Sequence, residues 1–100
     1  MRVTYEHHST RAEVRSKIEA GIAKALDPNS PYTRYAKDVR YAWEGDTVGF
    51  SLRAMGANIK GSVEITDTEV IVEDTLPLLL RAFERRAESR ILRLLGETVG

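Results

Sequence analysis

Cysteine is missing from the 100 residues of this chain, which excludes disulfide frameworks, thiolate-bound zinc or iron–sulfur centres and thiol catalysis. The chain also lacks any run of about 18 apolar residues, the length that a membrane-spanning helix requires. Its opening, "MRVTYEHHST", has no apolar segment of the kind that a secretory signal needs. We therefore expect a cytoplasmic protein with no transmembrane segment.

An excess of charge of either sign is missing too. The 15 basic and 15 acidic residues give a net charge of zero, so the field of the whole molecule cannot attract nucleic acid or an anionic membrane. We expect no nucleic-acid partner, and any contact with an anionic surface must come from a local patch.

The residue patterns of common catalytic and metal sites are also lacking. His7 and His8 are adjacent on a predicted strand and point to opposite faces, and no histidine follows at helical spacing, so they cannot converge on a metal ion. Ser51, in "GFSLR", lacks the G-x-S-x-G turn of a serine nucleophile, and the glycines belong to predicted strands and turns rather than to a phosphate loop. The sequence therefore predicts no catalytic residue, no cofactor and no metal site.

What the chain does contain is alternation of apolar and polar residues. A chain of this length fits a single domain, residues 1–100. A short strand opens the chain in "MRVTYEH", and four more follow within residues 39–43, 48–53, 57–66 and 69–74. These four predict a meander of antiparallel hairpins with one apolar face. We expect that face to carry Tyr41, Trp43, Val48, Phe50, Leu52, Ile59, Val63, Ile65 and, in the preferred register of the last strand, Val70 and Val72.

Two helices are predicted to cover this face. Thr10 and Glu13 have capping-box spacing, and the first helix ends at Asp27-Pro28. Its apolar stripe is Val14, Ile18, Gly21, Ile22 and Ala25. The second helix is predicted to begin near Thr75, with Pro77 in its first turn, and to stop at Gly96. Its stripe is Leu76, Leu79, Leu80, Phe83, Ala87, Ile91, Leu94 and Leu95.

The resulting order, β-α-β-β-β-β-α, predicts an α+β fold: a five-stranded antiparallel sheet with both helices on one face. The segment "DPNSPYTRYAKD", residues 27–38, is the only long irregular stretch, and it suits either a functional loop or a neutral insertion.

The outer arc of the second helix gathers arginines, with two leucines outside the apolar stripe. One interpretation is a solvated face in which Glu84 and Glu88 neutralise the arginines. The other is a contact surface for a partner subunit or an anionic, partly apolar interface. The candidate partner-binding residues are Leu78, Arg81, Arg85, Arg86, Leu92 and Arg93, with Arg90 at the edge of the arc.

From Arg40 to Leu95 the sequence resembles a small bacterial family of polyhydroxyalkanoic acid system, or polyhydroxyalkanoate granule-region, proteins. Its members look like "W-x-G-D … F … G … G-x-[LV]-x-[VI] … V … L-x-L-L-L-R-x-F … I … L". The matching positions here are Trp43, Gly45, Asp46, Phe50, Gly56, Gly61, Val63, Ile65, Val70, Leu76, Leu78, Leu79, Leu80, Arg81, Phe83, Ile91 and Leu95. The loop of residues 27–38 is longer than the usual link of the family.

The resemblance implies a bacterial cytoplasmic protein linked to storage-granule metabolism, and it supplies no catalytic residue. The element order also looks like a reduced helix-grip fold of the START/Bet v 1 kind, for which the sheet order would be 1-5-4-3-2. Larger members of that fold hold hydrophobic ligands between sheet and helix. Here the inward side chains are expected to fill that space: Trp43, Phe50, Leu52, Ile59, Phe83 and Ile91.

Three functions follow as hypotheses. The first is a non-catalytic accessory protein of polyhydroxyalkanoate granules, whose partner is a second copy of itself, a granule-bound protein or the granule surface. The second is a small carrier or sensor of a hydrophobic ligand, which a cavity above about 300 Å³ would favour. The third is an enzyme of polyhydroxyalkanoate metabolism.

Overall fold

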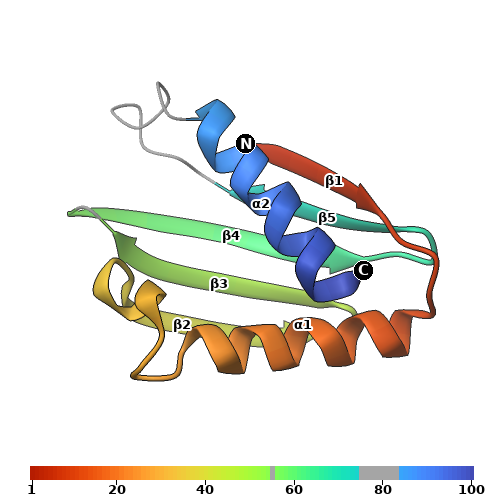
Figure 1. The fold of residues 1–100 in the computed structure, drawn as a ribbon, viewed down its shortest axis with the longest axis horizontal. Coiled ribbons are helices and arrows are strands. Elements are labelled where there is room, and N and C mark those ends of the chain that lie inside the picture. Colours follow the sequence, from red (N-terminus) through yellow and green to blue (C-terminus); the bar gives the residue numbers. More distant parts are fainter. Residues whose placement is uncertain (55, 75–83) are drawn as a thin grey trace.

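The computed structural model describes residues 1–54, 56–74 and 84–100, and in these ranges it forms five strands and two α-helices (Figure 1). The predicted start of the second helix at Thr75 and Pro77, and the stripe residues Leu76, Leu79, Leu80 and Phe83, lie outside the described residues. The elements are β1 (Arg2–Glu6), α1 (Arg11–Ala25), the 3₁₀ turn η1 (Pro31–Arg34), β2 (Lys37–Glu44), β3 (Thr47–Ala54), β4 (Ala57–Ile65), β5 (Glu69–Asp74) and α2 (Glu84–Val99).

The strands form one antiparallel sheet in the order β1-β5-β4-β3-β2, as predicted. The four strands from β2 to β5 pair consecutively, and β1 returns to pair with β5. β1 and β2 are therefore the edges of this sheet.

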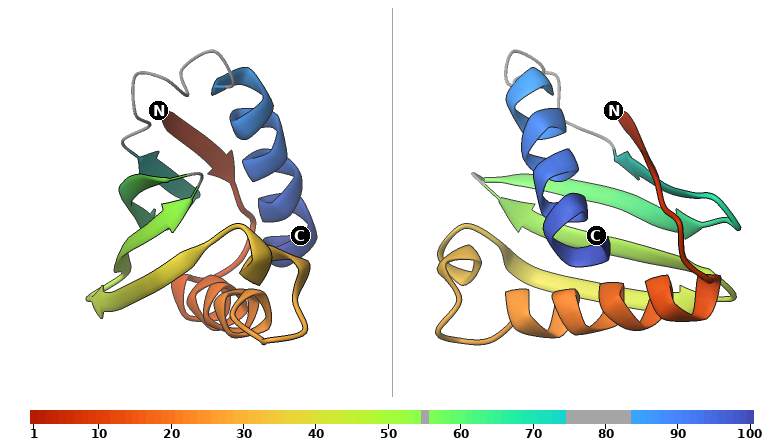
Figure 2. Two further views of the ribbon diagram at one scale, coloured as in Figure 1. Left: turned by 90° about the vertical axis from the view of Figure 1, so that its left-hand side faces the viewer. Right: turned by 45° about the vertical axis from the view of Figure 1, so that its right-hand side comes forward.

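The cross-strand register confirms the predicted face. Val48 on β3 faces Val63 on β4, which faces Val72 on β5, which in turn faces Val3 on β1. Val70 and Val72 are buried, so the preferred register of the last strand is right. Figures 1 and 2 show that both helices lie on the same side of this sheet, which is the side these valines occupy.

The buried core lies toward one end of the sheet. Val14 and Ile18 of α1 meet Leu95 and Val99 of α2 over the valines and Ile65. Toward the other end of the same face, Phe50, Leu52 and Ile59 are only half-buried. Tyr41 was expected in the core, but 37% of its surface is exposed because it sits on the edge strand β2. Trp43, also on β2, packs against the core while half-buried.

Local hydrogen bonding accounts for the start of α1, and the predicted end of α2 needs a correction. The hydroxyl of Thr10 accepts from the backbone N–H of Glu13 at 3.2 Å, as the capping pattern predicts. The Glu13 carboxylate accepts from the hydroxyl of Ser9 at 2.8 Å. The prediction that α2 stops at Gly96 is wrong: the helix continues to Val99, and Gly100 follows with a φ of 94°. Gly96 instead faces Tyr5, whose hydroxyl would lie 3.8 Å from a Cβ at that position.

Candidate functional site: an apolar groove between the helices

An open groove of about 1020 Å³ lies between α1, α2 and the sheet. Its described apolar lining comes from all three parts of the fold: Ile18, Ile22 and Ala25 of α1, Phe50, Val63 and Val72 of the sheet, and Ile91, Leu94 and Leu95 of α2. The described inward side chains therefore leave an open groove in a region that was expected from the sequence to be filled. Phe50 and Ile91, two of the residues expected to fill it, line the groove, and Phe83 lies outside the described residues.

The helices leave this space because they meet at one end and diverge from there. A Cβ at Gly21 of α1 would come 3.1 Å from the Cγ2 of Thr98 on α2, so the missing side chain allows a close approach. Near the same place, Lys17 Nζ donates to the carbonyl oxygen of Val99 at 3.1 Å. Figure 1 shows the C-terminal end of α2 close to α1 and its other end well away from it. The contact at Gly21 thus closes the groove at one end and leaves it open at the other.

Polar side chains form the rim of the groove. Lys24 lies in the last turn of α1, and the segment after the helix contributes Asp27, Asn29, Ser30 and Pro31. Local hydrogen bonds hold this segment: the Asp27 carboxylate accepts from the N–H of Asn29 at 2.8 Å, and the Asp27 carbonyl accepts from the N–H of Ser30 at 2.8 Å. Asp74, at the end of β5, and Glu97, on α2, complete the polar part of the lining. The loop that the sequence left open between a functional and a neutral role supplies part of this rim.

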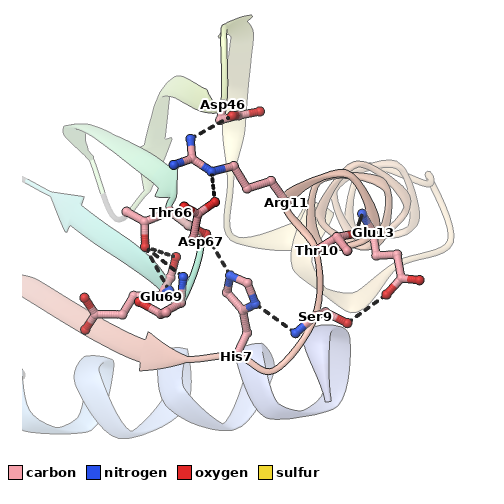
Figure 3. Close-up of polar contacts among 10 residues, drawn as sticks. His7, Ser9, Thr10, Arg11, Glu13, Asp46, Thr66, Asp67 and Glu69 are labelled. Carbon is pink, nitrogen blue, oxygen red and sulfur yellow. Dashed lines mark hydrogen bonds and ion pairs between the residues drawn. The ribbon is translucent and has the colours of Figure 1, made fainter.

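The two histidines differ in burial and in their contacts. His7 is only 2% exposed, and its Nε2 donates to the carbonyl oxygen of Thr66 at 2.8 Å while its Nδ1 accepts from the N–H of Ser9 at 3.2 Å (Figure 3). A carbonyl can only accept, so Nε2 carries a proton. His8 is exposed. No group of three metal-ligating side chains occurs within residues 1–54, 56–74 and 84–100.

Arg11 fastens the start of α1 to two turns of the sheet. Its Nε donates to Asp67 at 2.6 Å in the β4–β5 turn, and its Nη1 donates to Asp46 at 3.2 Å in the β2–β3 turn (Figure 3). The hydrogen bond from Arg11 and its positive charge lower the pKa of the Asp67 carboxyl. The hydrogen bonds to Asp67 and to Asp46 raise the pKa of the Arg11 guanidinium. Asp46 belongs to the W-x-G-D stretch, so this part of the motif positions α1.

Trp43 of the same motif also holds α1. Its indole N–H donates to the carboxylate of Glu19, and the hydroxyl of Tyr41 donates to the same carboxylate at 3.3 Å. The guanidinium of Arg15 lies 4.7 Å from the centre of the indole ring. The negative charge of Glu19 raises the pKa of the Tyr41 hydroxyl. These contacts tie α1 to the edge strand β2 and so fix one wall of the groove.

Those predicted partner-binding residues that the structure describes do not line the groove. Arg85, Arg86, Leu92 and Arg93 are exposed on α2, as is Arg90. Leu78 and Arg81 lie outside the described residues. The sequence did not single out the rim residues Lys24, Asn29 and Thr98, which gather from separate segments. The small residues Gly21 and Ala25 on the apolar stripe of α1 line the groove, but their spacing in the sequence did not indicate it.

The family model described as "Putative polyhydroxyalkanoic acid system protein (PHA_gran_rgn)" matches residues 1–98. It thus covers the β1–α1 part of the chain as well as the stretch that carries the sequence resemblance. No curated protein and no solved structure matches the chain, so the START/Bet v 1 helix-grip assignment stays a prediction. In the part of the chain that the structure describes, no helix is both long and apolar enough to span a membrane.

Proposed function

Because the chain belongs to the polyhydroxyalkanoic acid system family, we propose that it is a non-catalytic accessory protein of polyhydroxyalkanoate metabolism whose groove binds an apolar chain. The groove is the observation that supports this function. Its volume of about 1020 Å³ exceeds the lower bound of about 300 Å³ for pockets that hold small ligands. This proposal combines the first two hypotheses drawn from the sequence, the accessory role and the binding of a hydrophobic ligand.

The lining favours a polyester segment over a purely hydrocarbon chain. A polyhydroxyalkanoate alternates alkyl groups with ester carbonyls, which accept hydrogen bonds but carry no charge. The apolar walls suit the alkyl groups, and the Lys24 ammonium and the Asn29 amide on the rim are donors that can reach ester oxygens.

The charges of the rim favour a neutral chain over a free acid. Among the described residues, three carboxylates line the groove, on Asp27, Asp74 and Glu97, against one side-chain ammonium, on Lys24. The N-terminal ammonium lies 3.6 Å from Asp74 and offsets that carboxylate. The remaining excess is negative and opposes a ligand carboxylate.

A non-catalytic role is part of the proposal. The engagement of both His7 nitrogens by the backbone supports it, because this imidazole has no free nitrogen for proton transfer. The cytoplasm and the surface of storage granules are the locations that suit such a protein.

The test is a substitution that fills the groove. Ala25→Trp places a large side chain in the lining, whereas Ala23→Trp places it on an exposed part of α1 outside the groove. Titration with a methyl-ester-capped trimer of 3-hydroxybutyrate should show binding to the wild type and to Ala23→Trp. Binding should be at least tenfold weaker in Ala25→Trp, with circular dichroism unchanged in both variants. Equal affinity of the two variants, or no binding to the wild type at millimolar trimer, refutes the proposal.

A further inference from the structure

The exposed side of α2 carries four arginines that we call the arginine face: Arg85, Arg86, Arg90 and Arg93. Together with Ser89 they line a depression of about 550 Å³ that is separate from the groove. Figure 2 shows that one side of α2 faces the sheet while the other is directed away from it. The arginine face lies on this outer side, because Ile91 and Leu95 on the opposite side pack into the core.

Of the two glutamates that the sequence offers for neutralising this face, the structure describes the side chain of Glu88 but not that of Glu84. Among the described residues, the ion pairs involve the N-terminal ammonium, Arg2, Arg11 and Arg53, and none involves an arginine of α2. Arg86 and Arg90 are four residues apart and Arg90 and Arg93 three apart, spacings at which like charges repel on a helix. An anionic group bound across this face would relieve that repulsion.

The composition of α2 points to carboxylates as that group. Between residues 84 and 99 the sequence has four arginines and no lysine. A guanidinium binds a carboxylate or phosphate through two parallel hydrogen bonds, which a lysine cannot do. The face is about 12 Å long, from Arg85 to Arg93 at 1.5 Å per residue, which matches a short acidic segment.

Two further features favour a protein partner over a lipid or nucleic-acid surface. The net charge of zero provides no long-range attraction toward an extended anionic surface. Leu92, which is 37% exposed, lies one turn from Ser89 at the edge of the face and offers an apolar contact beside the charges. We propose that the arginine face binds an acidic segment of a partner protein, one in which carboxylates accompany an apolar residue. This site is independent of the groove.

The test uses a fluorescent peptide of ten residues with six glutamates and two leucines, and an otherwise identical peptide with glutamines in place of the glutamates. The double variant Arg86→Gln/Arg90→Gln removes two charges from the face. Arg34→Gln/Arg40→Gln removes two exposed charges elsewhere and is the matched control. We expect the acidic peptide alone to bind the wild type, with at least tenfold weaker binding to the first variant and unchanged binding to the control. Raising the salt concentration should weaken binding.

Three results overturn this proposal: no binding of the acidic peptide, equal weakening in the control variant, or binding to phosphatidylglycerol vesicles or polyphosphate without binding to the peptide. The groove variant Ala25→Trp should bind the acidic peptide normally, and Arg86→Gln/Arg90→Gln should bind the ester trimer normally. Failure of one proposal is thereby distinguished from failure of the other.

Discussion

The ring of Phe50 on β3 lies over Gly61, its cross-strand partner on β4: a Cβ at position 61 would come 2.6 Å from the Cζ of Phe50. The carbonyl oxygen of Glu73 would lie closer still to that Cβ. Gly61 is therefore the position at which the floor of the groove is most tightly constrained. The absence of a side chain there allows the close approach of the Phe50 ring and of the β5 backbone.

Gly61→Ala should destabilise the protein by about 1–3 kcal/mol, because the added methyl group must displace the Phe50 ring or the β5 backbone. Gly49→Ala is the control, since nothing lies within 4 Å of a Cβ at position 49. Urea denaturation should place Gly49→Ala near the wild type and Gly61→Ala well below it. Equal midpoints for the two variants would contradict the close approach.

His7→Ala should destabilise the protein by about 1–3 kcal/mol, because the Thr66 carbonyl and the Ser9 amide each lose a partner in a buried setting. His8→Ala changes an exposed side chain and should alter stability by less than about 0.5 kcal/mol. Thermal unfolding of the two variants gives the comparison. If His8→Ala proves the more harmful, the assigned role of His7 is wrong.

The pairing of Asp67 with Arg11 should make stability depend on pH in the acid range. The pKa of Asp67 is lower in the folded protein than its ordinary value, so its contribution is complete above that ordinary value, near pH 4, and is lost as pH falls through the folded-state pKa. Asp67→Asn should therefore unfold at lower urea concentration than the wild type at pH 7, and the difference should shrink by pH 2.5. Glu44→Gln, an exposed carboxylate with no ion pair in the described residues, should show a smaller difference at pH 7. A wild-type advantage over Asp67→Asn that is unchanged between the two pH values speaks against the pairing.

The negative excess on the rim should make the groove discriminate between neutral and charged ligands. We expect the methyl-ester trimer to bind about threefold more tightly than the free-acid trimer at low salt. The factor corresponds to the repulsion in water between one excess negative charge on the rim and the ligand carboxylate. Glu97→Gln should reduce this preference, and so should added salt. Calorimetric titration of both trimers decides the point. Tighter binding of the free acid would show that the negative charges of the rim do not control the choice of ligand.

The sheet could be predicted from the sequence because alternation with a period of two fixes which side chains share a face. Val48, Val63 and Val72 align across three strands as that pattern requires. The family match confirms the resemblance that the W-x-G-D stretch first indicated. The sheet order followed instead from the likeness of the element order to a reduced helix-grip fold.

The groove could not be predicted, because it depends on the angle between two helices that meet at Gly21 and Thr98, 77 positions apart in the chain. No periodicity within one element specifies such an angle. The error at Gly96 has a related cause: a glycine near a helix end is typical of a stop, but here α2 continues through it to Val99, which packs into the core. Tyr41 was placed in the core because alternation does not tell an edge strand from a central one.

The central claim is that the groove holds the polyester chain, and isoleucine methyl NMR tests it most directly. The chain has six isoleucines, of which Ile18, Ile22 and Ile91 line the groove while Ile59, Ile65 and Ile71 do not. On titration with the methyl-ester trimer of 3-hydroxybutyrate, we predict that the δ1-methyl signals of the first three shift in a saturable way and those of the other three stay in place. Absence of shifts at excess trimer, or equal shifts at Ile59, Ile65 and Ile71, would contradict the account.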